Sequence, residues 1–560
     1  MLKLDFNERS DYPGEWLKTI KLDTDSLWLY PKREVLESKL ADYFSLSAEN
    51  VFCSNGGDES IYILMRLIKE GCAMATDVMA SGKLILPLPA FSQYTWGVKS
   101  WNIETVEIAP QENLSIDIDA LKSAINSNPR SAVVLTSPNN PTGESIATET
   151  LQQLLQLAAD NQSWVFLDEA YIEFSTQASA MNLLQRYNNL IILRTFSKAY
   201  GLAGIRLGYL LGNEQLLNSF RERAMPFNVP TPTLTIAEQA LQPQAQQDMQ
   251  RYTQAIKNNR EQLCDWFRSV GITPIPAEGN FIFLKLTVEL ASLLTVYLKR
   301  NDILVRVFTE SYLKGCVRIT IPYNLQPLMD ALAVVFDPEL ICFDMDGVLI
   351  DTSSSYDNAI KATVKEFIGV DITDAEINTL RSQGGFNNDW VLSQQLVRLN
   401  GKKIDLNTIT QCFQSFYLGQ NNDGYINNES IMVKQPLMNR LQSRQQSIAI
   451  VTGRPGYEAR LGTDNLGSAF DYWRTTTIVS DDDVQNSKPD PEGILGLKSK
   501  LNCKTSWMIG DTPDDMQAAI RSGSIAIGIG LENKQSLLQA GADLVIDTVN
   551  QLTDLLTLKQ

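Results

Sequence analysis

Short apolar runs alternate with helical patterns along the whole chain. Many of these runs are rich in β-branched residues and end in polar or charged positions. They occupy residues 83–88, 131–137, 164–170, 189–195, 340–346, 447–453 and 506–511. Strands separated by helices predict an α/β architecture with mainly parallel sheets. Sites in open α/β folds lie at the carboxyl ends of strands, so the polar residues that end these runs are the first candidates for chemistry.

The same pattern predicts where the chain divides. Residues 325–336 have the apolar spacing of a helix, and a short DPEL linker follows before the next apolar strand. We therefore predict two parts, residues 1–337 and residues 338–560. A Gln-rich stretch at 241–254 is expected to form a helix with a solvated face.

Composition restricts the possible chemistry. The 560 residues include no histidine, which excludes a Ser-His-Asp relay and imidazole ligands to zinc. A net charge of -17 disfavours a nucleic-acid partner. Seven scattered cysteines without a CxxC pair predict free thiols in a reducing compartment. We find neither a signal-peptide pattern nor an apolar run of about eighteen residues, so we expect a cytoplasmic protein without a membrane span.

Three motifs in the first part each follow a predicted strand. They are SPNNPTG at 137–143, DEAYIEF at 168–174 and TFSKAYGLAGIRLGY at 195–209. In this order and spacing they resemble the class I and II aminotransferases of fold-type I. The resemblance implies pyridoxal 5′-phosphate as cofactor. It also implies a large α/β domain at about 31–244 and a small one formed by about 1–30 and 245–337.

The residue types suit that cofactor. Lys198 provides an amine for a Schiff base, and Asp168 provides a carboxylate that keeps the ring nitrogen protonated. The cofactor also needs hydrogen-bond donors at its ring hydroxyl, an aromatic ring against its face, and amides, hydroxyls and an arginine at its phosphate. The candidates are Asn140 and Tyr171 for the hydroxyl, Phe91 for the ring face, and Gly57, Asp58, Thr195, Ser197 and Arg206 for the phosphate. The alternative for Asp168 is a helix N-cap, and for Phe91 a core position.

Further motifs resemble histidinol-phosphate aminotransferases in particular. They are LYP at 29–31, SNGGDESI at 54–61, GNFIFLKL at 279–286, ILVR at 303–306 and GCVRIT at 315–320. The resemblance implies that Tyr30 reaches the cofactor phosphate of a partner subunit in a homodimer. It also implies that Asn7 lies in the substrate site and that Arg306 and Arg318 hold the distal anion of the substrate. Arg9 departs from the family pattern, which often has a small or aromatic residue there.

The second part contains four motifs in order. They are DxDGxxxD at 344–351, VTGR at 451–454, SKPDP at 487–491 and GDTPDD at 510–515. Together they resemble the haloacid-dehalogenase superfamily of phosphatases, with a Rossmann-like core. The helical stretch between the first two motifs, at about 353–440, resembles the helical cap of subfamily I. A cap of this kind closes over the substrate and excludes water.

The four motifs supply the groups that phosphate transfer needs. Asp344 is the expected nucleophile and forms an aspartyl-phosphate, and Asp346 is the expected general acid and base. Thr452 and Lys488 are expected to hold the phosphoryl oxygens. Crowded carboxylates need a cation, and Mg²⁺ prefers oxygen ligands. The predicted metal-site residues are Asp344, Asp346, Asp511 and Asp515.

We therefore predict a bifunctional enzyme of histidine biosynthesis. The first part transfers an amino group from glutamate to imidazole-acetol phosphate, releasing 2-oxoglutarate, and the second hydrolyses the resulting histidinol phosphate. Because threonine-phosphate decarboxylases share most of the first-part motifs, another phosphorylated amino alcohol or keto-phosphate is an alternative substrate. A second alternative is that the second part is a regulatory or structural module.

Overall fold

The computed structural model describes residues 1–22, 24–71, 81–381, 386, 388–420, 423–469, 473, 476–558. The predicted thiol Cys72 lies outside these ranges. No helix within them combines the length and the apolar character needed to cross a bilayer. The chain forms two compact units: the first comprises Met1–Arg268, Thr273–Leu286 and Asp302–Leu328, and the second comprises Ser269–Ile272, Thr287–Asn301 and Met329–Gln560.

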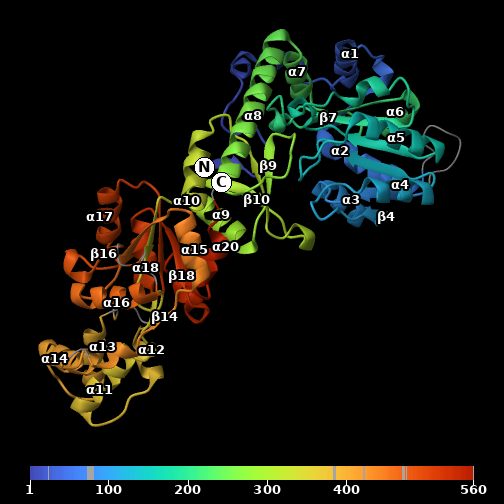
Figure 1. The fold of residues 1–560 in the computed structure, drawn as a ribbon. Coiled ribbons are helices and arrows are strands. Elements are labelled where there is room, and N and C mark those ends of the chain that lie inside the picture. Colours follow the sequence, from blue (N-terminus) through green and yellow to red (C-terminus); the bar gives the residue numbers. More distant parts are fainter. Residues whose placement is uncertain are drawn as a thin grey trace. The chain divides into compact units, whose positions relative to one another are not determined.

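The first unit is built around a seven-stranded sheet in the order β2-β8-β7-β6-β5-β3-β4 (Figure 1). The strands are β2 (Val51–Asn55), β3 (Lys83–Pro87), β4 (Glu104–Ile108), β5 (Ala132–Thr136), β6 (Trp164–Asp168), β7 (Leu190–Thr195) and β8 (Leu207–Gly212). Neighbours pair in parallel except β8, which runs antiparallel to both β7 and β2. The four apolar runs predicted for this part are therefore confirmed as strands, and the carboxyl ends of β6 and β7 lie side by side.

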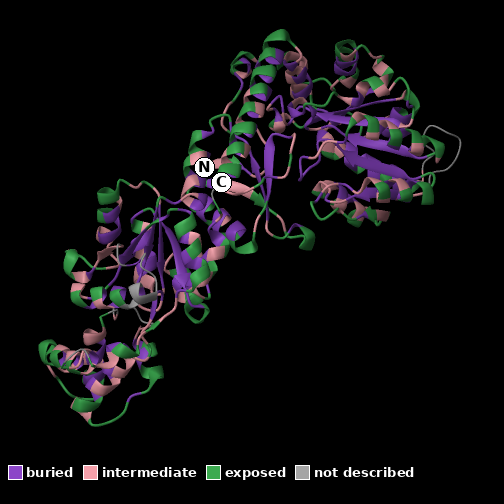
Figure 2. Cartoon of the chain, in the orientation of Figure 1, coloured by how far each residue is buried: buried purple, intermediate pink, exposed green. Residues whose placement is uncertain are grey.

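Helices pack around this sheet, and its strands are mostly buried except the edge strand β4, where only Ile108 is buried (Figure 2). The helices are α1 (Arg33–Phe44), α2 (Gly56–Glu70), α3 (Ser92–Trp101), α4 (Ile118–Ser127), α5 (Thr148–Asp160), α6 (Glu214–Arg221), α7 (Thr231–Ala240) and α8 (Pro243–Ser269). A second, four-stranded sheet has the order β1-β10-β11-β9. Its strands are β1 (Leu2–Leu4), β9 (Phe281–Lys285), β10 (Ile303–Val307) and β11 (Cys316–Thr320).

The Gln-rich stretch is helical and has the expected solvated face, where Gln244, Gln247, Gln250 and Gln254 are exposed, but its opposite face is buried. α8 buries Asp248, whose carboxylate pairs with Arg9 at 2.8 Å, both side chains being 2% exposed. The Arg9 guanidinium also lies 4.1 Å from the ring centre of Tyr252 on the same helix. A buried arginine needs a carboxylate, and this helix supplies one. Asp248 is therefore the ion-pair partner of Arg9, the residue that departs from the family pattern.

The second unit contains a six-stranded sheet in the order β16-β15-β12-β17-β18-β19, with every pair parallel. Its strands are β12 (Leu340–Phe343), β15 (Ser447–Val451), β16 (Thr477–Val479), β17 (Ser506–Gly510), β18 (Ile525–Ile529) and β19 (Leu544–Ile546). Its further helices are α9 (Val288–Arg300), α15 (Gln435–Ser443), α16 (Gly456–Ala469), α17 (Glu492–Leu501), α18 (Pro513–Arg521), α19 (Lys534–Gln539) and α20 (Leu552–Leu555). α10 (Gln326–Phe336) crosses the limit between the units and confirms the helix predicted there.

Between β12 and β15 the chain leaves the sheet and forms a helical insertion (Figure 1). Its helices are α11 (Tyr356–Ile368), α12 (Asp374–Arg381), α13 (Asp389–Leu399) and α14 (Leu406–Tyr417). They share a core of their own that includes Ile360, Leu396 and Phe413. The chain enters and leaves this insertion through the paired short strands β13 (Ile350–Asp351) and β14 (Ser430–Ile431).

Candidate active sites

Lys198 follows β7 at the carboxyl edge of the seven-stranded sheet. Its Nζ donates a hydrogen bond to the backbone oxygen of Phe6 at 2.9 Å and lies 5.7 Å from the ring centre of Tyr171. The side chain is half-buried. A single amine held by one carbonyl in a partly enclosed site is free to form a covalent bond with an aldehyde.

Asp168 ends the neighbouring strand β6 and is buried. One carboxylate oxygen accepts a hydrogen bond from the Tyr94 hydroxyl at 2.9 Å, and the other accepts from the backbone N–H of Ala170 at 3.0 Å. Burial raises the pKa of this carboxyl to about 6, although both hydrogen bonds and the charge of Lys198 oppose the shift. Among the described residues no Lys or Arg forms an ion pair with Asp168. This buried carboxylate could therefore pair with a cationic group of a bound ligand.

Two amides converge on the hydroxyl of Tyr171. Asn7 donates to it at 3.0 Å and Asn140 at 3.3 Å. Asn7 is completely buried and adopts a left-handed backbone conformation with φ 57°. The side chain of Thr320 fixes it by accepting from the Asn7 backbone N–H and donating to its side-chain oxygen. The structure thus brings together three of the predicted residues.

Arg318, on β11, is a buried guanidinium without a carboxylate partner among the described residues. It donates to the side chain of Asn140 and to the backbone oxygen of Asp5, while its Nε has no partner. Burial lowers its pKa to about 10. Arg306 lies directly opposite it in the β10–β11 pairing and is exposed. Like charges opposite one another destabilise a sheet, whereas an anion bound between them removes the repulsion.

The predicted phosphate-binding residues lie around the start of α2. Arg206 pairs with Asp58 in the first turn of that helix at 2.6 Å, and the Thr195 hydroxyl donates to Ser197 at 3.0 Å. Gly57 lies in the same turn, where the free backbone amides of a helix favour an anion. A side chain at Gly208 would approach the Gly57 nitrogen to 2.6 Å, so the close packing of β8 on this turn requires glycine.

Two predicted cofactor residues lie outside this direct network. Phe91 immediately precedes α3 and contacts Tyr94 edge to face, with ring centres 6.3 Å apart, and Tyr94 in turn donates a hydrogen bond to Asp168. Tyr30 is 75% exposed and stacks on Phe227 at 4.3 Å. Tyr94 itself was missed in the sequence, although its position one helical turn after Phe91 was the available signal.

These groups fit pyridoxal phosphate. Lys198 offers the amine, Asp168 is a buried anion that lacks a cation, and the turn around Gly57 offers amides beside Arg206. The three features match the aldehyde, the basic ring nitrogen and the phosphate of that cofactor.

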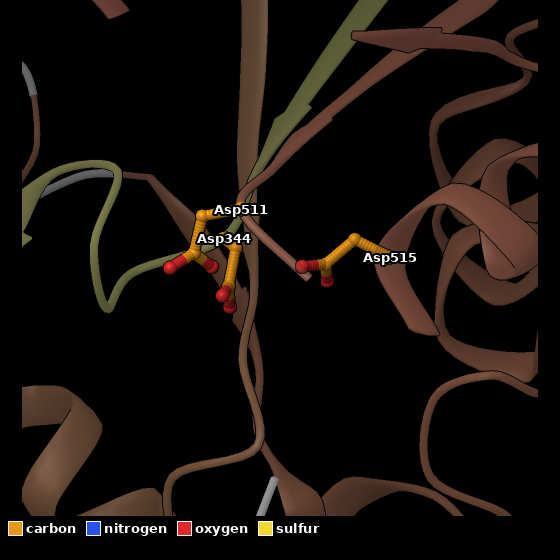
Figure 3. Close-up of side chains that lie close together, drawn as sticks. All are labelled: Asp344, Asp511 and Asp515. Carbon is orange, nitrogen blue, oxygen red and sulfur yellow. The ribbon is translucent and has the colours of Figure 1, made fainter. Parts of the chain in front are cut away.

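The second unit gathers three carboxylates at the carboxyl edge of its sheet (Figure 3). Asp344 follows β12, Asp511 follows the neighbouring strand β17, and Asp515 lies in the first turn of α18. One oxygen from each lies within 4.8 Å of the others. These residues could hold a hard cation such as Mg²⁺.

Lys488 lies against this cluster. Its Nζ contacts Asp344 at 2.8 Å, Asp515 at 2.6 Å and the backbone oxygen of Val451 at 3.1 Å. Burial nevertheless raises the pKa of Asp344 to about 7, and burial with the neighbouring carboxylates raises the pKa of Asp511 well above its ordinary value. One lysine is therefore too little positive charge for three aspartates, and a divalent cation fits the deficit.

Thr452 and Asp346 are the other two predicted residues of this site. Thr452 is buried directly after β15, which neighbours β12. Asp346 is outside the group of three carboxylates, and its Oδ1 is bound by Arg454. Arg454 and its second partner, Glu429, were missed in the sequence, although Arg454 stands inside the VTGR motif.

A cavity of about 710 Å³ opens over these residues within the second unit. Asp344, Asp346, Lys488 and Asp511 line its floor. The helical insertion supplies part of its wall, including Tyr356, Arg381 and Trp390. The space is large enough for a small phosphorylated molecule between the cluster and the insertion.

The fold and both sites can now be compared with known proteins. The family described as aminotransferase class I and II matches residues 2–333, and the one described as haloacid dehalogenase-like hydrolase matches residues 341–529. The chain therefore belongs to the class I and II aminotransferases and carries a haloacid dehalogenase-like hydrolase domain in its second half. It is an aminotransferase with a fused phosphatase, and the predicted fold class is confirmed.

Relatives of the first half are histidinol-phosphate aminotransferases. That of Pectobacterium atrosepticum is 32% identical over 305 residues, which are 54% of this chain and 82% of the relative. A histidine biosynthesis bifunctional protein, HisCD, of Photorhabdus laumondii is 33% identical over 285 residues, which are 50% of this chain but only 34% of that longer protein. The fold resembles the solved histidinol-phosphate aminotransferase from Sinorhizobium meliloti in complex with pyridoxal-5′-phosphate, with a TM-score of 0.52 and 24% identity over 60% of this chain and 89% of that one.

Proposed function

We propose that this chain catalyses two consecutive steps of histidine biosynthesis. The first is pyridoxal-phosphate-dependent transfer of the amino group of glutamate to imidazole-acetol phosphate, which gives histidinol phosphate and 2-oxoglutarate. The second is Mg²⁺-dependent hydrolysis of histidinol phosphate to histidinol and phosphate. The observation that carries the proposal is the pairing of two sites in one chain: Lys198 with the uncompensated Asp168, and the Asp344 cluster. The product of the first activity would carry a phosphate ester, which the second activity would cleave.

The residues of the first site divide the work of transamination. Pyridoxal phosphate, when bound, supplies an electron sink for the electrons released at the substrate Cα. Lys198 would hold the cofactor aldehyde through its amine and, once released, would accept the proton of the substrate Cα. Asp168 would keep the ring nitrogen protonated, while Tyr171 and Asn140 would bind the ring hydroxyl. Arg318 and Arg306 bind the anionic end of the substrate, next to Asn7.

The residues of the second site carry out phosphate transfer in two steps. Asp344 attacks phosphorus and forms an aspartyl-phosphate, while the bond to the alcohol oxygen breaks and Asp346 protonates that oxygen. Asp346 then takes a proton from water, which attacks the same phosphorus and releases phosphate and Asp344. Thr452 and Lys488 hold the phosphoryl oxygens. Asp344, Asp511 and Asp515 would hold Mg²⁺, which would supply the positive charge that the cluster lacks.

We further propose that the first half forms a homodimer in the cytoplasm. An exposed apolar surface includes Trp28, Leu29, Tyr30, Met225 and Phe227, with exposed fractions from 57% to 76%. A surface of this kind is typical of a protein interface. It supports the proposed role of Tyr30 at the cofactor phosphate of the partner subunit.

A coupled assay of the full chain tests the proposal. Imidazole-acetol phosphate and glutamate are supplied with pyridoxal phosphate and Mg²⁺, and 2-oxoglutarate and free phosphate are followed together. We expect equal final amounts, with phosphate appearing after a lag. The histidinol phosphate assignment fails if 2-oxoglutarate accumulates without phosphate, or if the enzyme cleaves other small phosphate esters much faster than histidinol phosphate.

A further inference from the structure

Arg454 connects the proposed general acid to the helical insertion. Its Nε and Nη2 both donate to Oδ1 of Asp346, at 2.8 and 2.5 Å. The same guanidinium donates to both carboxylate oxygens of Glu429, at 2.8 and 3.3 Å. The side chains of Arg454 and Glu429 are only 1% and 2% exposed, whereas that of Asp346 is 35% exposed. Arg454 and Glu429 therefore form a buried ion pair, and the partly exposed Asp346 at its other side lines the cavity.

The geometry fixes Asp346 in one orientation. A guanidinium is planar and its donors have a fixed spacing, so two bonds to one oxygen restrain rotation of the carboxylate. Both bonds end on Oδ1, and Oδ2 accepts no hydrogen bond from the described residues. Oδ2 is thus the oxygen left to meet the leaving alcohol and, later, the attacking water.

Glu429 connects this arrangement to the insertion. It directly precedes β14, where the chain returns from the insertion toward the sheet. Its Oε1 also accepts hydrogen bonds from Tyr417 on α14 at 2.9 Å and from Ser355 at 3.1 Å. Arg454 lies 5.0 Å from the ring centre of Tyr356 at the start of α11. The guanidinium therefore contacts a motif aspartate and Tyr356 of α11 directly, and it is linked to α14 through Glu429.

We propose that Arg454 is a positioning residue that aims Asp346 at the leaving-group oxygen, and that Glu429 makes this aim depend on the seating of the insertion. The proposal rests on the phosphatase activity proposed above. Arg454 itself does not touch the reacting atoms. An alkyl alcohol is a poor leaving group and needs a proton from Asp346, whereas p-nitrophenolate leaves without one. Loss of Arg454 should therefore slow alkyl esters selectively.

The test compares the two ester classes in the full chain with Mg²⁺. The aryl probe is p-nitrophenyl phosphate, and the alkyl probe is whichever of histidinol phosphate, O-phosphoethanolamine and glycerol 3-phosphate the wild type cleaves best. Because general acid–base catalysis contributes about 10²–10⁴-fold, we expect Arg454→Gln to lower kcat/KM for the alkyl ester by about 10²-fold. The kcat/KM value covers the steps up to departure of the alcohol and excludes the later attack of water, so for the aryl ester it should fall less than about fivefold. Arg454→Lys should recover part of the loss, and Glu429→Gln should show the same pattern more weakly.

Arg300→Gln is the matched control. Arg300 also pairs with a buried aspartate of the second unit, Asp543 at 2.7 Å, and neither residue lines the cavity over Asp344. We expect it to leave the alkyl-to-aryl ratio of kcat/KM unchanged. An equal loss of kcat/KM on both esters in Arg454→Gln, or the same ratio change in Arg300→Gln, overturns the positioning role. If the wild type cleaves neither ester class, or if Asp344→Asn retains the activity, the proposed phosphatase itself fails instead.

Discussion

The two sites handle buried charge in opposite ways. In the first unit, Asp168 and Arg318 are single buried charges, and each lacks an oppositely charged partner among the described residues. In the second unit, three carboxylates crowd together around one lysine. A ligand of the first site must therefore bring both a cation and an anion, whereas the second needs a cation before anything else. That difference matches an organic cofactor with an anionic substrate in one case and a metal ion in the other.

The largest expected effect is the loss of phosphatase activity at the second site, without a change in transamination. Asp344→Asn keeps the shape of the side chain but removes the nucleophile, so phosphate release should fall on the order of 10⁵-fold. Transamination by the same preparation should be unchanged, which serves as the internal control. Because the change also removes one charge from the crowded cluster, the Mg²⁺-free protein should unfold at the same or a higher temperature. Retained phosphate release would mean that Asp344 is not the nucleophile.

The reciprocal change breaks the first site. Lys198→Ala removes both the covalent attachment and the proton carrier, and transamination should fall about 10⁴-fold. Attachment is measured separately by borohydride reduction followed by peptide mass analysis, which should find the cofactor on the Lys198 peptide of the wild type only. Phosphatase turnover provides the control. Cofactor fixed to another lysine in the wild type would contradict the assignment.

Sequence patterns foresaw the parts of both sites that follow from strand ends. Asp168 and Asp344 stand directly at or after apolar runs, and parallel pairing brings such positions to one edge of a sheet. The position of a residue at a strand end does not predict its contacts with segments that are distant in the sequence. Glu429 meets Arg454 only because β13 and β14 pair, and Asp248 meets Arg9 only because α8 turns that face inward. A polar residue at a helical spacing gives no sign of whether its own face will be buried, so the Gln-rich stretch predicted the exposed face of α8 but not the burial of Asp248.

A smaller effect is expected from Arg318, the buried cation of the first site. Arg318→Gln removes a buried cation whose proposed partner is the anionic end of the substrate. Truncating one member of a buried charged pair costs about 4 kcal/mol, so kcat/KM for glutamate should fall about 10³-fold. Cofactor content should remain unchanged. Lys285→Gln, an exposed change on the neighbouring strand β9, is the control and should leave kcat/KM within about twofold. A loss of bound cofactor in Arg318→Gln would indicate a structural role instead.

The smallest effect concerns the stability of the cofactor-free protein. Burial raises the pKa of Asp168 from 3.8 to about 6, so the folded state binds its proton more tightly than the unfolded state. The stability that comes from the protonated form is complete below pH 3.8 and is lost as the pH rises through 6. One pKa unit corresponds to about 1.4 kcal/mol, so the free energy of unfolding should fall by about 3 kcal/mol from this group.

Asp168→Asn isolates that contribution, because the other carboxylates titrate equally in both proteins. The difference in unfolding free energy between Asp168→Asn and the wild type should grow in favour of the variant between pH 4 and 7, measured by denaturant unfolding of cofactor-free protein. Asp160→Asn, at an exposed position on α5, should show no such trend. Bound pyridoxal phosphate should abolish the trend in the wild type, since its ring cation compensates Asp168. A trend that persists with the cofactor bound would mean that Asp168 does not face the ring nitrogen.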